Sequence, residues 1–421
     1  MAEIAPLRVL TFTSLFPSAA RPRHGIFVET RLQHLVDDCA VDARVVAPVP
    51  WFPFRSPRYG RYADYAATPR RETRAGGLRV TYPRYLMLPR VGVAFQPESM
   101  ARAARADIAA LRRGGWVPDI IDAHYLYPDG VAAALLAHEL GIPFIATARG
   151  SDVNVLARTP GPAARIVHAA GLAAALIAVS WPLKKALVEL GVAEAKIVIL
   201  RNGVDLDVFQ LEDKEAARRR LGFGAERLAI CVGNLQPEKG HALAIESLCM
   251  LPGFRLVIAG EGPLRGELTA LARRVGVAER MSFLPTMTQG ELRHLYCSAD
   301  VMLLPSTREG WPNVVLESLA CGTPVVAVDV GAVREMLNRP EFGRVVTSRD
   351  PVPFARAVLR ATNAPERREQ LRRHAAGFDW ISISRGQLEV MTRVLGRAPY
   401  ASASTEAGEG AHRSGASRST A

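Results

Sequence analysis

The sequence is poor in cysteine and has no long hydrophobic run. Its 421 residues include five cysteines, an odd number with no CxxC pair, which argues against a disulfide framework and against a zinc site. No stretch of 18 or more apolar residues occurs, which excludes a membrane-spanning helix. The first 16 residues also lack the basic segment, apolar core and cleavage site of an export signal. We therefore expect a cytoplasmic protein.

Lysine is equally scarce, so the positive charge of the chain is almost all arginine. Only five of the 53 basic residues are lysines, and with 41 acidic residues the formal net charge is +12. Residues 51–115 hold 13 arginines against four acidic residues. The same segment carries nine aromatic residues, namely Trp51, Phe52, Phe54, Tyr59, Tyr62, Tyr65, Tyr82, Tyr85 and Phe95.

This basic aromatic insert at 51–115 has three interpretations. Arginines and aromatic rings suit an anionic inner-membrane surface or another anionic acceptor. They also suit single-stranded nucleic acid, on which aromatic side chains stack. The third interpretation is a solvated loop in an arginine-rich chain. We favour the membrane or anionic acceptor and expect no nucleic acid, since no nucleic-acid recognition module is present.

Outside this insert, short apolar strands alternate with amphipathic helices, and the pattern occurs twice. Strands are expected at 7–14, 43–49, 119–124, 143–149, 175–180 and 196–200, and again at 228–233, 255–260, 281–285, 301–305 and 324–329. Apolar strands between helices indicate parallel sheets covered on both faces. We predict an α/β fold of two Rossmann-like, doubly wound domains.

The expected domain boundaries follow from this repetition. The first domain spans 1–203 and the second spans 204–378. A helix at 379–397 is expected to return to the first domain. The small, polar residues 398–421 show no periodicity and are expected to form a disordered tail. Ligands of such sheets bind beyond the carboxyl ends of the strands, so the site is expected in the cleft between the domains.

The strongest motif is PSTREGWPNVVLESLACGTP at 305–324. Glu309 lies in a loop after a strand, Pro312 suits the first turn of a helix, and Glu317 lies within that helix. A helix N-terminus attracts phosphate, while carboxylates accept hydrogen bonds from sugar hydroxyls. The motif therefore suits a ligand that is part phosphate and part sugar.

A second motif, CVGNLQPEKG at 231–240, places Lys239 between two glycines after a strand. A lysine there can neutralise a diphosphate that the glycine backbone allows to approach. The loop is not a Walker A sequence, because GxxxxGKS is absent. The glycines at 260 and 262 lack the spacing of a dinucleotide fingerprint, and we interpret them as a phosphate-side or structural turn.

Taken together, these motifs resemble the retaining glycosyltransferases of family 4, which have the two-domain GT-B architecture. The resemblance spans about residues 8–395 and is nearest to bacterial enzymes that build exopolysaccharide, lipopolysaccharide or teichuronic-type chains. Its further motifs are GEGP at 260–263, RNGVD at 201–205, FPSAARPRHGIFVETRL at 16–32, AHYLYPDG at 123–130 and TARGSD at 147–152.

The resemblance implies roles for individual residues. His124, Glu309 and Lys239 are the catalytic candidates, and Arg149 and Asp152 are placed on the acceptor side. Lys239 should bind the donor diphosphate, Glu309 the donor sugar and Glu317 the ribose. The full set of implied donor-binding residues is Gly25, Gly233, Asn234, Lys239, Gly262, Leu284, Arg308, Glu309, Gly310, Trp311, Asn313, Val314 and Glu317.

Asn234 departs from the family pattern, which usually has an arginine there. Arg308 and Arg149 are the candidates to compensate. Asp205 and Asp207 form a DxD pair, which in single-domain transferases holds a divalent cation. Here the pair lies between the two domains, and we interpret it as a structural turn.

We expect an enzyme that moves a hexose-like sugar, with retention, from a nucleotide-diphosphate sugar to a glycan or lipid-linked acceptor in bacterial surface polysaccharide synthesis. No cofactor and no metal are expected. Two alternatives remain open: a nucleotide-sugar 2-epimerase of the same architecture and a non-catalytic nucleotide-sugar-binding subunit.

Overall fold

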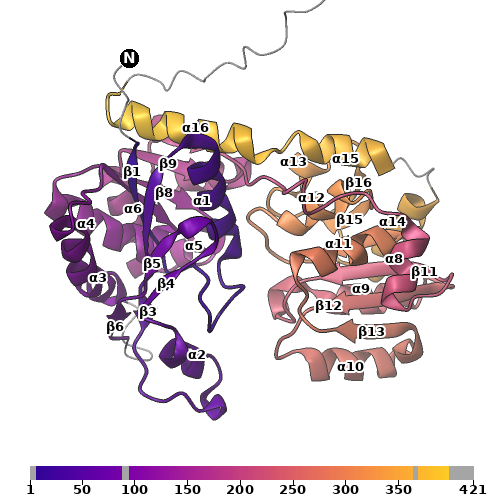
Figure 1. The fold of residues 1–421 in the computed structure, drawn as a ribbon. Helices are drawn as coiled ribbons and strands as arrows, with labels where there is room; N and C mark the ends of the chain where they lie inside the picture. Colours follow the sequence, from indigo (N-terminus) through magenta and orange to yellow (C-terminus); the bar gives the residue numbers. More distant parts are fainter. Residues whose placement is uncertain (1–5, 88–93, 364–367, 398–421) are drawn as a thin grey trace, which may run out of the picture.

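The computed structural model describes residues 6–87, 94–363 and 368–397. Two α/β domains lie side by side, and the C-terminal helices run along one end of both (Figure 1). Both main sheets are flanked by helices and are parallel, as the repeated strand–helix pattern predicts, except for one antiparallel pair in the first sheet. All five cysteines are free. The tail at 398–421 lies outside the described residues.

The first domain is built on an eight-stranded sheet in the order β10-β9-β8-β7-β1-β2-β5-β4. All neighbouring strands are parallel except β4 and β5, which are antiparallel. The strands are β1 (Arg8–Phe12), β2 (Asp42–Val46), β4 (Arg71–Thr73), β5 (Arg79–Thr81), β7 (Ile120–His124), β8 (Phe144–Ala148), β9 (Ala175–Ala178) and β10 (Ile197–Ile199). Every residue of β7 and β8 is buried, including the polar residues Asp122, His124 and Thr147.

The helices around this sheet are α1 (Ile26–Cys39), α3 (Gln96–Arg113), α4 (Val131–Leu140), α5 (Ser151–Asn154), α6 (Pro160–Leu172) and α7 (Trp181–Glu189). A two-stranded ribbon of β3 (Val49–Pro50) and β6 (Arg84–Tyr85) and the short helix α2 (Arg61–Ala67) extend from its lower edge (Figure 1).

The structure corrects the picture of residues 51–115 as one surface insert. Strand β5 pairs with β2 inside the main sheet, and Tyr82 and Tyr85 are buried. Helix α3 buries one face, including Met100 and Ile108. Only the part around α2 projects from the domain. The sequence did not reveal these strands and this helix, because arginines occupy the exposed positions between the buried residues.

The second domain has a six-stranded parallel sheet in the order β13-β12-β11-β14-β15-β16. Its strands are β11 (Arg227–Val232), β12 (Phe254–Ala259), β13 (Met281–Leu284), β14 (Val301–Leu304), β15 (Val325–Val328) and β16 (Gly343–Val346). Its helices are α8 (Lys214–Leu221), α9 (His241–Leu248), α10 (Arg265–Arg274), α11 (Gln289–Ser298), α12 (Asn313–Ala320), α13 (Val333–Met336), α14 (Pro351–Thr362) and α15 (Arg368–Ala376). Strand β16 and helices α3 and α8 are absent from the sequence expectations.

The last described helix, α16 (Trp380–Val394), packs against the first domain. Leu388 and Met391 join the core of that domain. Gln387 receives a hydrogen bond from Arg31 at 2.6 Å and donates one to Asp122 at 2.7 Å. The second domain is thus followed by a helix that belongs structurally to the first. None of the described helices combines the length and apolar character needed to cross a membrane.

Candidate active site

The carboxyl ends of both sheets face the space between the domains, where two cavities of about 50 and 840 Å³ lie. The domains meet at Gly150 and Gly310. A Cβ atom on Gly310 would lie 2.2 Å from the carbonyl oxygen of Arg149, and one on Gly150 would lie 2.9 Å from the Cα of Gly310. This contact, next to Glu309, requires glycine on both sides.

Two catalytic candidates meet at the second-domain side of this cleft. Lys239 ends a short turn after β11, and Glu309 lies in the loop after β14. The Lys239 Nζ atom is 2.8 Å from Glu309 Oε1. The following Gly240 has φ 62°, and a Cβ there would lie 2.2 Å from the carbonyl oxygen of Pro305. Close packing of the two loops therefore brings the ammonium group and the carboxylate together.

Two glycine-containing loops, 231–240 after β11 and 260–263 after β12 (the glycine loops), pack their backbones against each other beside this pair. A Cβ on Gly260 would lie 2.1 Å from the carbonyl oxygen of Gly233, and one on Gly262 would lie 2.5 Å from that of Leu235. The Gly260 N–H donates to the carbonyl oxygen of Leu284 at 3.1 Å, which joins the loop after β12 to the end of β13. This close packing accounts for glycine at these positions, and the donor-binding role expected of Gly233 and Gly262 stays a prediction.

Glu317 lies in α12 and is half-buried. The Tyr296 hydroxyl donates a hydrogen bond to its carboxylate at 2.8 Å, and burial raises the pKa of Glu317 to about 7. With Asn313, it lines the smaller interdomain cavity. The carboxyl group of Glu317 therefore changes its charge close to neutral pH.

The remaining residues expected around α12 differ in exposure. The Trp311 side chain is buried against Phe378, and its indole nitrogen has no partner among the described residues. Val314 is half-buried. Arg308 and Asn234 are exposed, and no described side chain pairs with the Arg308 guanidinium. The structure thus gives no sign that Arg308 reaches the Lys239 loop.

On the first-domain side, His124 ends β7 and is buried. Its Nε2 atom lies 3.3 Å from an Asp122 carboxylate oxygen, and its Nδ1 atom lies 2.6 Å from an Arg149 Nη2 atom. Burial lowers the pKa of His124, with Asp122 acting in the opposite direction. Both ring nitrogens are occupied, so His124 orients Arg149. We infer a positioning role from this geometry, and the catalytic role expected from the sequence stays a prediction.

Arg149 links this buried group to the other domain. Its Nη1 atom donates to Asn202 Oδ1 at 2.9 Å, and the Asn202 amide donates to Asn313 Oδ1 at 3.2 Å at the start of α12. Burial lowers the pKa of Arg149 to about 9. A chain of hydrogen bonds therefore runs from β7 through the interdomain linker to the helix that carries Glu317.

Asp152 and Gly25 shape loops. The buried Asp152 carboxylate accepts hydrogen bonds from the backbone N–H groups of four residues, at 2.8 to 3.2 Å: Leu126, Arg149, Gly150 and Val153. The carboxylate is therefore occupied by its own loop, and its expected place on the acceptor side stays a prediction. Gly25 precedes α1 with φ 72°, and a Cβ there would lie 2.2 Å from the Leu15 carbonyl oxygen.

Three residues of this region were missed by sequence reasoning. Asp129 is buried and accepts hydrogen bonds from the backbone N–H and the hydroxyl of Ser14, and burial raises its pKa to about 7. Its place directly after a buried strand, in YPDG, is the signal that could have found it. Asn202 lies in the RNGVD motif, which was recognised without a role for its asparagine, and Gln387 lies in no motif.

The DxD pair forms a turn. The Asp205 carboxylate accepts from the backbone N–H groups of Asp207 and Val208 at 2.9 and 3.0 Å. Within the described residues, no three His, Cys, Asp or Glu side chains are grouped as a metal site would need.

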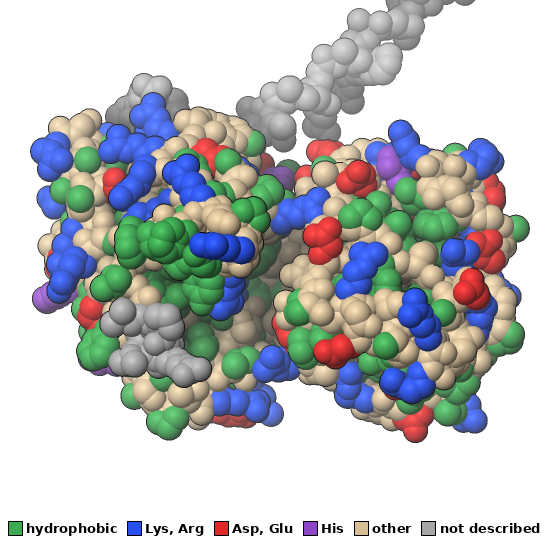
Figure 2. Space-filling model, turned by 90° about the horizontal axis from the view of Figure 1, so that it is seen from below, with side chains coloured by type: hydrophobic (Ala, Val, Ile, Leu, Met, Phe, Trp, Pro, Cys, Tyr) green, Lys and Arg blue, Asp and Glu red, His purple; other side chains and the backbone are tan. Residues whose placement is uncertain are grey.

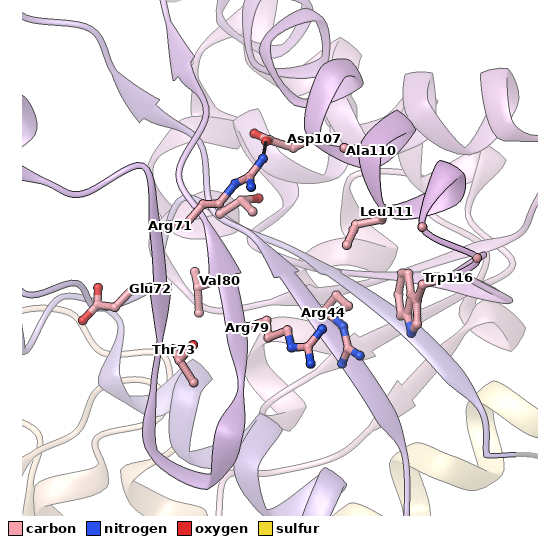
Figure 3. A pocket seen from close by; sticks show the side chains of 13 residues that line it. Arg44, Arg71, Glu72, Thr73, Arg79, Val80, Asp107, Ala110, Leu111 and Trp116 are labelled. Atoms are coloured by element: carbon pink, nitrogen blue, oxygen red, sulfur yellow. Dashed lines mark ion pairs between the residues drawn. The ribbon is translucent and has the colours of Figure 1, made fainter.

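Another hollow of about 650 Å³ lies in the first domain (Figure 3). It is bordered by the start of β5 and the end of α3, with Arg44, Arg79 and Trp116 in its wall. Arg71 and Asp107 face each other across it at 3.9 Å. Residues of β4, β5 and the second half of α3 line this hollow, and no described residue of the second domain does.

Comparison with known proteins agrees with this architecture. Residues 61–208 match the family model described as Glycosyltransferase Family 4, and residues 213–378 match Glycosyl transferases group 1. The putative teichuronic acid biosynthesis glycosyltransferase TuaC of Bacillus subtilis (strain 168) is 33% identical over 363 residues, covering 84% of this chain and 89% of the relative. A D-inositol 3-phosphate glycosyltransferase of Acidothermus cellulolyticus is 34% identical over 318 residues, covering 68% and 69%.

Solved structures share the fold at low identity. Sucrose-phosphate synthase from Thermosynechococcus elongatus superposes with a TM-score of 0.75 at 17% identity, covering 93% of this chain and 99% of that one. Anabaena HepE in complex with UDP-glucose gives 0.69 at 17% identity, covering 92% and 99%. With its two parallel-sheet domains and its TuaC-like sequence, the chain belongs to glycosyltransferase family 4 and has the GT-B fold.

Proposed function

We propose that this protein transfers a sugar from a nucleotide-diphosphate sugar to a glycan or lipid-linked acceptor in surface polysaccharide synthesis. The observation that carries the proposal is the ion pair of Lys239 and Glu309 beside the stacked glycine loops. Its cation suits a diphosphate and its carboxylate suits sugar hydroxyls. The name of the TuaC relative and the UDP-glucose bound to the HepE neighbour support the same substrates.

The chemistry requires stabilisation of a departing diphosphate. A donor diphosphate next to Lys239 would take the ammonium group from Glu309, and the freed carboxylate would accept hydrogen bonds from the donor sugar. A positive group that is already positioned where negative charge develops lowers the activation barrier. One such group typically raises the rate by a factor of about 10² to 10³. In this proposal Lys239 supplies that charge without a metal. Retention at the anomeric carbon rests on the family resemblance.

The acceptor is proposed to approach from the exposed aromatic part of the first domain. Trp51, Phe54 and Phe95 expose between 53% and 68% of their surface, an unusual degree for large apolar side chains. Figure 2 shows hydrophobic side chains gathered next to basic side chains on this domain. Such a surface suits the inner face of an anionic membrane. Co-sedimentation with anionic vesicles at low salt, and its loss in a Trp51→Ala and Phe54→Ala double variant, tests this contact.

The transfer itself is tested with a panel of UDP-, GDP- and ADP-sugars. Incubation with each donor and a lipid-linked or oligosaccharide acceptor is expected to yield product that depends on both substrates, with a retained anomeric configuration by NMR. Activity should persist in EDTA. Sugar epimerisation without acceptor would favour the 2-epimerase instead, and binding without turnover would favour a non-catalytic subunit. Neither alternative is favoured by a feature of the structure.

A further inference from the structure

The larger interdomain cavity, of about 840 Å³, lies between residues 55–67 of the first domain (the α2 region) and the glycine loops of the second domain. Asn234, Gln236, Glu261 and Gly262 form its second-domain wall, in which Glu261 is the one charged side chain. Arg55, Arg61 and Asp64 are the charged residues of the opposite wall. The positive charge of this cavity therefore comes entirely from the first domain, across the cleft.

Among the described residues, the second-domain wall of this cavity holds no cation, and Arg349, which lies beside Gly240, donates its Nη1 group to the carbonyl oxygens of Pro305 and Ser306. A diphosphate ester carries about two negative charges, and charges of one sign close together need compensation. Lys239 contributes one positive charge, which Glu309 already balances at 2.8 Å. Glu238, next to Lys239, and Glu261 add negative charge to the same loops. Binding a diphosphate there calls for a further cation.

The α2 region is held by a cluster of aromatic side chains. The Phe52 ring contacts the rings of Tyr59 and Tyr62, with centroids 5.4 and 5.3 Å apart. Tyr62 contacts Tyr65 in turn, and the Arg21 guanidinium lies 5.1 Å from the Tyr65 ring. This aromatic cluster connects α2 to the first loop of the domain and fixes the backbone that carries the two arginines.

Both arginines are free to bind an anion. Arg55 and Arg61 are exposed, and neither forms an ion pair with a described residue. The Arg61 guanidinium lies 5.4 Å from the Tyr62 ring and forms a hydrogen bond with the Tyr62 side chain, which occupies only part of its five N–H donors. An arginine binds phosphate through two parallel hydrogen bonds, a geometry that lysine does not offer. Figure 2 shows blue side chains where the first domain approaches the second.

We propose that Arg55 and Arg61 reach across the cleft and bind the diphosphate of the donor, completing a phosphate site of which Lys239 is the second-domain part. The inference rests on the proposed function and adds residues to it that no motif in the sequence identifies. In this proposal, the closed arrangement of the two domains is needed for donor binding, because groups from both domains contact the diphosphate.

The experiment measures UDP affinity by calorimetry in the wild-type protein, in Arg55→Ala, in Arg61→Ala and in the double variant. Each arginine removed is expected to weaken UDP binding about tenfold, as the loss of a hydrogen bond to a charged group predicts. Uridine, which has the same base and ribose but no phosphate, should bind equally to all of them. Arg58→Ala is the matched control, since Arg58 is exposed nearby but pairs with Tyr59 and lies outside the cavity wall.

A compensating change makes the test specific. Asn234 faces the arginines from the second-domain wall, so Asn234→Arg in the double variant should restore much of the lost UDP affinity. Unchanged UDP affinity in the double variant, while the wild-type protein binds UDP and transfers sugar, would overturn this inference and leave the proposed function intact. Equal losses for UDP and uridine would also overturn it. A wild-type protein that bound none of UDP, GDP or ADP would contradict the proposed function itself.

Discussion

Lys239 and Glu309 form a 2.8 Å ion pair that joins the loop after β11 to the loop after β14. They lie 70 residues apart in the sequence, and the packing of Gly240 against the Pro305 backbone sets their distance. Each neutralises the other in this structure. Their contributions to binding and to transfer are therefore coupled, and changing one residue alters the charge that the other presents.

Glu309→Gln is expected to separate donor binding from transfer. The amide cannot balance the Lys239 charge, so the lysine becomes available to bind phosphate. The affinity for UDP should therefore stay the same or rise. The transfer rate should fall by about 10² to 10³, because the carboxylate no longer accepts hydrogen bonds from the sugar in the transition state. Calorimetry and steady-state kinetics on one preparation measure both. A parallel loss of UDP affinity would contradict this division of roles.

The buried carboxyl group of Glu317 predicts a pH dependence of donor binding. Burial raises its pKa to about 7, so the group is neutral below that pH and ionised above it. The ionised form accepts hydrogen bonds from two ribose hydroxyls more readily. Affinity for UDP-glucose, whose diphosphate does not titrate in this range, should therefore rise as the pH increases from 6 to 8. Glu317→Gln should flatten the profile, and an identical profile in that variant would refute the assignment.

His124 is expected to act through its hydrogen bonds with Asp122 and Arg149. A neutral imidazole with both nitrogens occupied transfers no proton, so kcat should show no step attributable to histidine between pH 5.5 and 8. His124→Gln keeps an acceptor for Arg149 and should retain activity within about tenfold. His124→Ala should lose about 10², as expected when reacting groups are displaced. Equal losses in both variants would argue for a catalytic imidazole.

Gly310→Ala is expected to prevent the observed contact of the two domains. The added methyl group would lie 2.2 Å from the Arg149 carbonyl oxygen, a distance that requires the domains to separate. Transfer should fall by about 10² while the unfolding temperature changes little, and small-angle scattering should show a larger radius of gyration. The matched control is Gly266→Ala in α10, where a Cβ meets nothing within 4 Å. Full activity in Gly310→Ala would contradict a requirement for closure here.

The sequence predicts the two domains and the positions of Lys239 and Glu309, because these depend on local patterns. Apolar strands bounded by helices identify the sheets, and the loops after those strands hold the motif residues. Helix α3 and the burial of Tyr82 went unpredicted, because neighbouring arginines dominate the composition of that segment.

The buried polar network was equally beyond sequence reasoning. The partners of Asn202 and Gln387 come from elements brought together only by the domain arrangement and by the return of α16. For Asp152, the sequence identified the residue but not its hydrogen-bond partners. Its motif was recognised, but only the structure shows that four backbone N–H groups occupy its carboxylate.

The most direct test of the account is donor binding and transfer in Lys239→Ala, with Lys185→Ala as a control from an exposed position on α7. We predict that Lys239→Ala weakens UDP binding, leaves uridine binding unchanged and lowers the transfer rate by about 10² to 10³, whereas Lys185→Ala behaves as the wild type. A Lys239→Ala protein with wild-type UDP affinity and wild-type transfer would contradict the proposed donor site.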